Sequence, residues 1–198
     1  MMKTIEALRA GDAAIFPTDT VYGIGVAVLH ASSPQIIYDL KRREAGKPIA
    51  WLVGGPEALD VYGDDVPPQV RSLAHEHWPG ALTIVVKASR AVPPPFRSAA
   101  GTIGLRMPAN ETALEIIRAV GPVAASSANV SGGPDPRTAS DVAPELLKHV
   151  PVVLDGGTLG SGVASTVVNC SQGGLAILRQ GGVRIQPWES PPAPTSAS

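Results

Sequence analysis

The segment best suited to chemistry is 124–133, which reads Ala-Ala-Ser-Ser-Ala-Asn-Val-Ser-Gly-Gly. The apolar stretch 121–125 predicts a buried strand, and short polar side chains and glycines follow it at once. In open α/β sheets ligands bind beyond the carboxyl ends of strands, and glycine-rich backbone presents N–H groups to anions. Ser127 and Asn129 are therefore candidates for binding an anionic or nucleotide ligand. A polar turn that caps a helix is the alternative.

Two arginines lie in stretches that otherwise predict apolar strands. Arg106 belongs to 103–107, and Arg179 ends 176–179. A buried charge is costly unless it is paired, so each arginine needs a partner from the protein or from a ligand. A structural ion pair is the alternative for either arginine alone. Two of them, together with the polar strand end at 17–23, predict a shared anion site.

A basic segment at 41–48 reads Lys-Arg-Arg-Glu-Ala-Gly-Lys-Pro and follows a predicted helix. Cations at a helix C-terminus complement the helix dipole, so a solvated helix end is one interpretation. The other interpretation is a phosphate site. If the helix ends near Gly46, then Lys41, Arg43 and Lys47 can converge on one polyphosphate.

Several familiar catalytic patterns are absent from the sequence. It contains no G-x-x-x-x-G-K-[ST] loop and no G-x-S-x-G nucleophile elbow. Gly23-Ile24-Gly25 lacks the third glycine of a dinucleotide-binding fingerprint. His75 and His77 are two positions apart on a predicted helix, which is poor geometry for a zinc site. We therefore expect no metal ligands from the protein.

The elements that must position these residues alternate between strands and helices. Strands are expected at 13–16, 49–53, 82–87, 103–107, 123–125, 152–154, 166–168 and 176–179. Helices are expected at 3–10, 33–46, 69–77, 110–119 and 140–150. The last strands follow one another without helices between them. We therefore predict an α/β fold with a mixed, twisted sheet and flanking helices.

The composition fits one domain with a disordered tail. Of the 198 residues 44% are hydrophobic but only 4% are aromatic, so we expect a core of aliphatic side chains. Residues 1–186 are assigned to the folded domain. Residues 187–198 are rich in Pro, Ser and Ala and are assigned to a disordered tail.

Charge, cysteine content and hydropathy exclude several classes of protein. The net charge is -1, so the chain lacks the bulk positive charge of a nucleic-acid-binding domain. The single cysteine, Cys170, excludes an internal disulfide and favours a reducing, cytoplasmic location. No apolar run reaches the ~18 residues of a membrane span, and 1–11 does not resemble a signal peptide.

Seven segments occur together in an order that is typical of one family. They are Pro-Thr-Asp-Thr-Val-Tyr-Gly at 17–23, Lys41-x-Arg43 with Lys47-Pro48, Trp78-Pro79-Gly80 with Thr83, Gly104-Leu105-Arg106-Met107-Pro108, Ser127-Ala128-Asn129-x-Ser131-Gly132, Ser165-Thr166-Val167-Val168 and Leu178-Arg179-x-Gly181. Together they resemble the YrdC-type family of threonylcarbamoyl-AMP synthases over residues 13–183. The resemblance implies that 1–186 is a catalytic domain of the short form, with a mixed α/β fold and a deep positive cavity.

The same resemblance implies an activity and its partners. The family is a group of nucleotidyltransferases that form threonylcarbamoyl-AMP and pyrophosphate from L-threonine, bicarbonate and ATP. A downstream tRNA threonylcarbamoyl-transfer complex would use the product for tRNA modification, and weak tRNA or RNA binding is a further expectation. Mg²⁺ would bridge the ATP phosphates without dedicated protein ligands.

Site residues are carried over from the family to matching positions of this chain. Four cations would hold the phosphates, the first two as catalytic residues: Lys41, Arg43, Lys47 and Arg179. Three polar residues would hold the nucleotide: Thr102, Ser127 and Asn129. Arg106 would bind the threonine carboxylate through its guanidinium fork. Thr20 and Ser165 would contact the other polar groups of threonine.

The chain departs from the family pattern at four positions. Leu52 stands where a histidine is common near threonine, and Asp135 stands where a serine is common near the nucleotide. Glu44 replaces a frequent proline, and Asn169 replaces a frequent aspartate. The negative charge of Asp135 is unfavourable beside phosphate, which puts the nucleotide contact expected there in question.

Two other functions stay open from the sequence. One is an RNA-binding member of the same superfamily that lacks synthase activity, although the chain has few aromatic residues for base stacking. The other is a carbamoyl-adenylate-forming domain. In other proteins that domain belongs to much longer chains with acylphosphatase and zinc modules, which this sequence does not contain.

Overall fold

One mixed sheet organises the fold. The computed structural model describes residues 1–44, 48–159 and 161–188. Within these ranges the sheet has nine strands in the order β7-β1-β2-β6-β3-β5-β4-β8-β9. The strands are β1 Ala14–Phe16, β2 Gly23–Ala27, β3 Ala50–Leu52, β4 Leu82–Lys87, β5 Thr102–Arg106, β6 Val123–Ser127, β7 Val152–Val153, β8 Thr166–Asn169 and β9 Ala176–Arg179.

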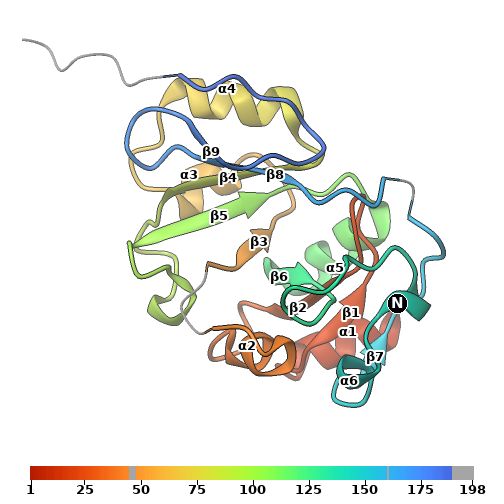
Figure 1. Cartoon of the computed structure of the whole chain (residues 1–198). Helices are drawn as coiled ribbons and strands as arrows, with labels where there is room; N and C mark the ends of the chain where they lie inside the picture. The colour runs from red at the N-terminus through yellow and green to blue at the C-terminus, as the bar shows by residue number, and fades with distance from the viewer. Residues whose placement is uncertain (45–47, 160, 189–198) are drawn as a thin grey trace, which may run out of the picture.

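Helices flank this sheet (Figure 1). They are α1 Met2–Arg9, α2 Gln35–Lys41, α3 Ala58–Tyr62, α4 Pro68–His77, α5 Glu111–Val120 and α6 Pro144–Leu147, with short 3-10 helices η1 Pro94–Phe96 and η2 Ala139–Asp141. Strand β3 runs parallel to β5, and β4 runs parallel to β8, whereas β1, β2 and β6 form antiparallel pairs. The predicted mixed α/β sheet is therefore confirmed.

Three elements, β2, α3 and the short η1, are not predicted from the sequence. Strand β2 is missed because it contains two glycines, which usually weaken a strand. Its second glycine, Gly25, is needed for packing, since a Cβ there would lie 2.7 Å from Val123 Cγ1 on the neighbouring β6. The helix expected at 140–150 is wrong in extent. Only η2 and the four-residue α6 form, because Pro144 cannot donate a backbone hydrogen bond within a continuous helix.

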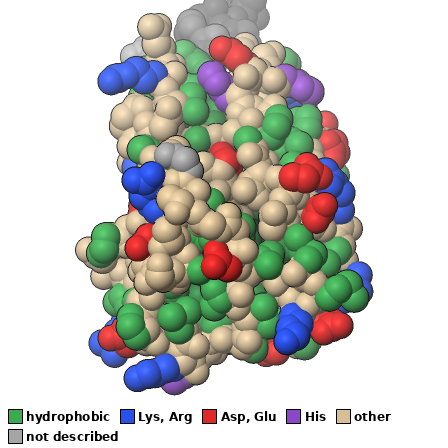
Figure 2. All heavy atoms as spheres, turned by 90° about the vertical axis from the view of Figure 1, so that its right-hand side faces the viewer, with side chains coloured by type: hydrophobic (Ala, Val, Ile, Leu, Met, Phe, Trp, Pro, Cys, Tyr) green, Lys and Arg blue, Asp and Glu red, His purple; other side chains and the backbone are tan. Residues whose placement is uncertain are grey.

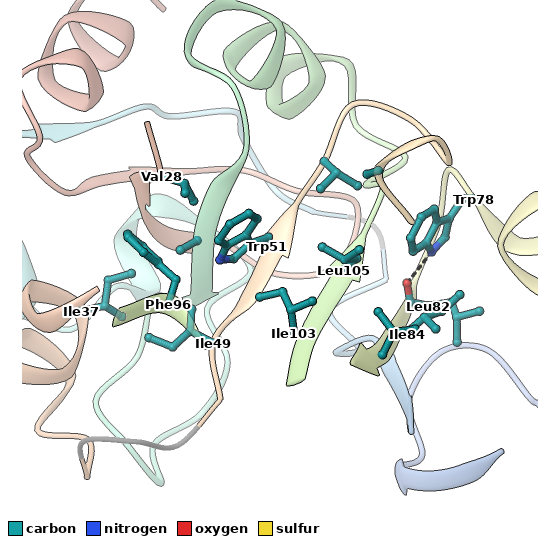
Figure 3. Close-up of a cluster of buried hydrophobic side chains, with 14 of the residues drawn as sticks. Val28, Ile37, Ile49, Trp51, Trp78, Leu82, Ile84, Phe96, Ile103 and Leu105 are labelled. Atoms are coloured by element: carbon teal, nitrogen blue, oxygen red, sulfur yellow. Dashed lines mark hydrogen bonds between the residues drawn. The ribbon is translucent and has the colours of Figure 1, made fainter. Parts of the chain in front are cut away.

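The larger of two hydrophobic cores packs on one face of the sheet (Figure 3). Side chains alternate between the faces of a strand, so β3 directs Trp51 into this core. The Trp51 ring makes edge-to-face contacts with Tyr62 at 5.1 Å and Phe96 at 5.8 Å between centroids. At the other end, Trp78 Nε1 donates a hydrogen bond of 2.7 Å to the Leu82 carbonyl.

The opposite face is covered by α1 and α5. A second core joins these helices to residues of β1, β2, β3 and β6: Leu8, Ala14, Phe16, Ala27, Leu52, Ala113, Leu114, Ile116, Ile117, Val120 and Val123. Helix α5 begins where the sequence predicts, since Asn110 Oδ1 accepts a hydrogen bond of 2.9 Å from Ala113 N. No residue of β4, β5, β8 or β9 belongs to this second core. The pocket described below lies on this same face and extends from β2, β6 and β3 onto β5, β4, β8 and β9.

The described chain continues past residue 186, where the tail is expected to begin. The backbone of Trp188 forms an isolated antiparallel bridge with Leu175, whose N–H donates to the Trp188 carbonyl at 2.8 Å. The Trp188 side chain packs against the larger core. The fold therefore includes at least two residues of the expected tail, and 189–198 lie outside the described residues. Among the described helices, none has the length and apolar character required to cross a bilayer.

Candidate active site

A pocket of about 290 Å³ opens on the sheet face that also carries Leu52. Four consecutive strands, β2, β6, β3 and β5, each contribute a small residue to its lining: Gly23, Ala125, Ala50 and Gly104. Because these side chains are minimal, a ligand can approach the backbone of the sheet closely. Polar residues from the strand ends and loops surround this floor.

Gly104 provides a direct test of the floor. A Cβ at this position would meet its neighbours at 3.4–3.6 Å, which is ordinary contact, so we expect Gly104→Ala to change the free energy of unfolding by less than about 1 kcal/mol. Gly104→Leu would fill the floor and is expected to weaken binding of the nucleotide that the family resemblance implies by more than about tenfold. Calorimetric titration with ATP and thermal denaturation measure the two effects. Gly182→Leu, at an exposed glycine outside the lining, is the matched control, and equal losses in both variants would contradict the prediction.

Arg106, at the end of β5, is fixed by three hydrogen bonds. Its Nε donates to the Gly80 carbonyl at 3.0 Å, one terminal nitrogen donates to Thr20 Oγ1 at 3.0 Å, and the other forms an ion pair with Asp19 at 2.6 Å. Burial lowers the pKa of Arg106, and the charge of Asp19 opposes that effect. A guanidinium group has five N–H donors, so one hydrogen on each terminal nitrogen stays available to a ligand in the pocket.

Arg179, at the end of β9, is held by Ser165. Its Nε donates to the Ser165 carbonyl at 3.0 Å, and a terminal nitrogen donates to Ser165 Oγ at 3.1 Å. Ser165 Oγ is also 2.9 Å from Thr83 Oγ1, on β4. All three residues line the pocket, so this group forms a second polar wall beside Arg106.

Lys41 is buried and does not belong to the pocket lining. Its Nζ donates to the carbonyls of Ser127 and Asn129, the latter at 2.6 Å, and to Asn129 Oδ1 at 2.9 Å. Its ammonium hydrogens therefore hold the turn that follows β6, whereas the sequence predicts that they hold phosphate. Burial and, to a smaller extent, Arg43 lower the pKa of Lys41 to about 8, while Asp135 raises it.

The turn after β6 is ordered by Asn129. Its Oδ1 accepts a hydrogen bond of 2.7 Å from Ser127 Oγ, and its Nδ2 donates to the Gly133 carbonyl at 2.6 Å. Ser127 lines the pocket, but Asn129 does not. The predicted polar segment is therefore a strand end that lines the pocket with Ser127, and hydrogen bonds of Asn129 hold the turn that follows.

The structure brings six of the ten predicted site residues to the pocket lining. They are Thr20, Arg43, Arg106, Ser127, Ser165 and Arg179. Thr102 is not in the lining. It lies at the start of β5, where its Oγ1 is 2.7 Å from Ser98 Oγ. Lys41 and Asn129 are not in the lining but hold the turn that follows Ser127, and Lys47 lies outside the described residues.

The sequence alone predicts no individual role for Asp19, Thr18 or Thr83. Asp19 and Thr83 each have a signal that could have revealed them. Asp19 is a carboxylate in a strand-end motif, and the chain also contains an arginine that needs a partner. Thr83 is a single polar residue in the apolar stretch 82–86, and it is buried in the structure.

Three arginines give the described part of the lining its charge. Arg43, Arg106 and Arg179 line the pocket, and no Asp or Glu appears among the described lining residues. Burial is the main cause that lowers the pKa of Arg179 and of Arg106. Asp135 raises the pKa of Arg179 and Asp19 raises that of Arg106, while the neighbouring arginine (Arg43 for Arg179, Arg179 for Arg106) adds a smaller lowering effect, because like charges disfavour one another. An anionic ligand would relieve this repulsion. The face in Figure 2 differs, since its basic and acidic side chains are interspersed without a continuous basic strip.

The family model of Sua5/YciO/YrdC, described as "Telomere recombination", matches residues 6–181. The chain belongs to the Sua5/YciO/YrdC family. The threonylcarbamoyl-AMP synthases of Pyrococcus abyssi and Bacillus subtilis are 36% and 35% identical to it, each over 92% of this chain and 54% of their own length. A Mycobacterium tuberculosis relative is 36% identical over 94% of this chain and 86% of its own. This member of the family thus spans about half the length of the Pyrococcus and Bacillus proteins.

Solved structures of Sua5/YciO/YrdC proteins share the fold. The crystal structure of P. abyssi Sua5 complexed with L-threonine has a TM-score of 0.86 and 36% identity, over 91% of this chain and 53% of that one. Escherichia coli YciO has a TM-score of 0.81 over 90% of this chain and 87% of its own, and its 24% identity supports a likeness in fold alone. The predicted family and the predicted YrdC-like fold are confirmed.

Proposed function

We propose that this chain is an L-threonylcarbamoyladenylate synthase, a nucleotidyltransferase that forms threonylcarbamoyl-AMP and pyrophosphate from L-threonine, bicarbonate and ATP. The observation that carries the proposal is the row of three arginines, Arg106, Arg179 and Arg43, along one small-floored pocket. Such a pocket suits a ligand pair with a carboxylate at one end and phosphates at the other. The names of the relatives and the threonine-bound structure of P. abyssi Sua5 support the choice of substrates.

Each part of the pocket has a role in this proposal. The available N–H groups of Arg106 bind the threonine carboxylate, and Arg43 and Arg179 neutralise the phosphates. The threonine nitrogen bonds to the carbon of bicarbonate-derived CO₂ and gives a carbamate after losing a proton. A carbamate oxygen then bonds to the α-phosphorus of ATP, the bond to the bridging oxygen breaks, and pyrophosphate leaves.

No side chain has to act as a covalent nucleophile in this reaction. The protein contributes alignment of the carbamate with the α-phosphorus and positive charge where negative charge develops. In this proposal Arg43 and Arg179 supply that charge, and the hydrogen bond from Lys41 to the Ser127 carbonyl, which holds the turn after β6, supports the shape of the pocket beside them.

The proposal also includes a Mg²⁺ ion, a downstream partner complex and a cytoplasmic location. Mg²⁺ would be held by the ATP phosphates rather than by side chains of this chain, and it would supply additional charge neutralisation. The described residues contain no group of three His, Cys, Asp or Glu that could hold a metal. A tRNA threonylcarbamoyl-transfer complex would consume the product, and weak contact with tRNA is included. The reaction would take place in the cytoplasm, a setting that suits the free Cys170.

Pyrophosphate release from ATP tests the proposed function. We expect release only when threonine and bicarbonate are both present, because the carbamate forms from the two together. Omitting either one is the internal control, and Gly104→Leu supplies a protein control. Equal release with carbamoyl phosphate alone would contradict the proposal and favour carbamoyl-adenylate formation instead.

A further inference from the structure

The pairing of β8 with β9 contains a one-residue bulge beside Arg179. Val168 lies opposite Ile177, but its neighbour Val167 lies opposite Arg179, so Leu178 is an extra residue on β9. Residues directly opposite one another in an antiparallel pair point to the same face of the sheet. Val167 lines the pocket, whereas Val168 belongs to the larger core. The bulge therefore brings Arg179 to the pocket face.

A regular strand β9 would direct Arg179 to the other face. Ile177 and Arg179 are two positions apart, and residues two apart in a regular strand share a face. Ile177 packs against the larger core, so a regular register would aim the guanidinium group at apolar side chains, where an unpaired charge is costly. Bulges next to binding sites re-aim side chains in this way. The place of Arg179 in the pocket thus depends on what holds the bulged register.

The hydroxyl group of Thr166, the first residue of β8, holds the turn that follows Arg179. Thr166 Oγ1 donates to the Val183 carbonyl at 2.5 Å and accepts hydrogen bonds from Gly181 N at 2.9 Å and Val183 N at 3.1 Å. A hydroxyl group has one proton and two lone pairs, so the turn uses its whole capacity. Thr166 is fully buried, which shields these hydrogen bonds from water.

The same turn packs closely against the backbone that precedes β8. Gly182 N donates to the Ala164 carbonyl at 3.1 Å. A Cβ at Gly181 would lie 2.2 Å from that same carbonyl oxygen, so the close approach requires glycine. The backbone just after Arg179 is therefore fixed relative to β8 by both hydrogen bonds and packing.

We propose that Thr166 is a positioning residue for phosphate binding, which fixes the turn after β9 and with it the bulged register that points Arg179 into the pocket. The inference rests on the proposed function, in which Arg179 neutralises phosphates. Thr166 is not in the pocket lining, so it acts through Arg179 and not by touching the ligand. Holding the arginine in place before the ligand arrives reduces the ordering cost of binding.

The first test measures the affinities for inorganic pyrophosphate and for L-threonine by calorimetry. Thr166→Val keeps the shape of the side chain but removes all three hydrogen bonds to the turn. We expect pyrophosphate affinity to fall about tenfold in Thr166→Val and to be largely restored in Thr166→Ser, with threonine affinity changed less than about twofold in both. Thr4→Val is the matched control, because Thr4 is also fully buried and its hydroxyl group has no hydrogen-bond partner among the described residues.

The second test needs no ligand. Arg179 Nε donates to the Ser165 carbonyl at 3.0 Å, so its N–H should exchange slowly with solvent in the wild type. We expect faster exchange in Thr166→Val, because the backbone that holds the two residues together is released. Nuclear magnetic resonance measures this exchange, and the Nε–H signal is assigned by its absence in Arg179→Lys.

Three results would overturn the inference in a folded Thr166→Val variant: wild-type pyrophosphate affinity, unchanged exchange of the Arg179 Nε–H, or equal losses for pyrophosphate and threonine. If Thr166→Val does not fold, Gly181→Ala takes its place, because the added Cβ would push the turn from the Ala164 carbonyl. Gly182→Ala is its control, since a Cβ there meets Ala81 Cβ at an ordinary 3.6 Å. Failure of the proposed function is distinguishable: the wild type would bind no pyrophosphate, while the exchange measurement would still decide whether Thr166 positions Arg179.

Discussion

Arg106→Ala is expected to weaken threonine binding by about 2–5 kcal/mol while changing ATP affinity far less. The reason is the geometry of the guanidinium group, which keeps one N–H free on each terminal nitrogen for a carboxylate after binding Gly80, Thr20 and Asp19. Arg106→Lys should restore little of the loss, because an ammonium group cannot reproduce the planar fork. Calorimetric titration with threonine and, separately, with ATP measures the two affinities.

The control for Arg106 must account for its ion pair. Removing the arginine leaves the mostly buried carboxylate of Asp19 without its partner, so the variant should also be less stable. Asp19→Asn combined with Arg106→Ala removes that penalty and is the matched background. Arg118→Ala removes an arginine from the exposed pair with Glu111 and should leave both affinities unchanged. Unchanged threonine affinity in the double variant would refute the role of Arg106.

Lys41→Met is the second change with a large expected effect. Methionine has a similar length but no donor, so the carbonyls of Ser127 and Asn129 and the Asn129 side-chain oxygen lose their common partner. We expect the free energy of unfolding to fall by at least about 1–3 kcal/mol and synthase activity to be nearly abolished. Chemical denaturation and pyrophosphate release measure the two effects. Arg42→Met changes the adjacent, exposed cation and should leave both nearly unaltered, and full activity of Lys41→Met would sink the assigned role.

The nucleotide affinity of the wild type should also depend on pH, because the hydrogen bonds of Lys41 depend on its protonation. Lys41 is protonated below its pKa of about 8, and above it the neutral amine has two N–H groups for three acceptors. We therefore expect nucleotide affinity to decline as the pH rises through about 8, and this step should be missing in Lys41→Met.

The effect of Lys41 on the free energy of unfolding has the opposite sign. Its pKa is lower in the folded state than the 10.5 of the free side chain, so between these values the unfolded state binds more protons and linkage raises the free energy of unfolding with pH.

The sequence predicts the strands and the pocket-facing arginines well because both follow from local rules. A charge in an apolar strand needs a partner whatever the fold, which is why Arg106 and Arg179 stand out in the sequence itself. Thr83 and Asp19 are harder to find, since their roles depend on which strand ends meet. Lys41 shows the limit most clearly. Its contact with the turn at 127–129 depends on the tertiary structure and cannot be read from the sequence. The sequence predicts that Lys41 contacts phosphate, whereas in the structure its buried ammonium group holds that turn.

Strand β2 marks a second limit of local reasoning. Its glycines indicate a loop by propensity, yet Gly25 is the residue that permits close packing against β6. The sequence near Gly25 does not reveal this requirement, because the partner strand β6 is formed by residues about a hundred positions later in the chain. The predicted boundaries are also wrong at 140–150, where Pro144 divides the expected helix into shorter pieces.

The order of the strands has a consequence for how the protein folds. Neighbours β2 and β6, β4 and β8, and β1 and β7 are far apart in sequence, and the pocket draws on positions from Thr18 to Arg179. Pairings of this kind close long loops before they are stabilised, which slows folding. The pocket is therefore completed only when the last strand joins the sheet. In a refolding experiment, ligand binding should return with the slowest kinetic phase, after most secondary structure has formed, so that binding competence reports on the completed chain rather than on any early intermediate.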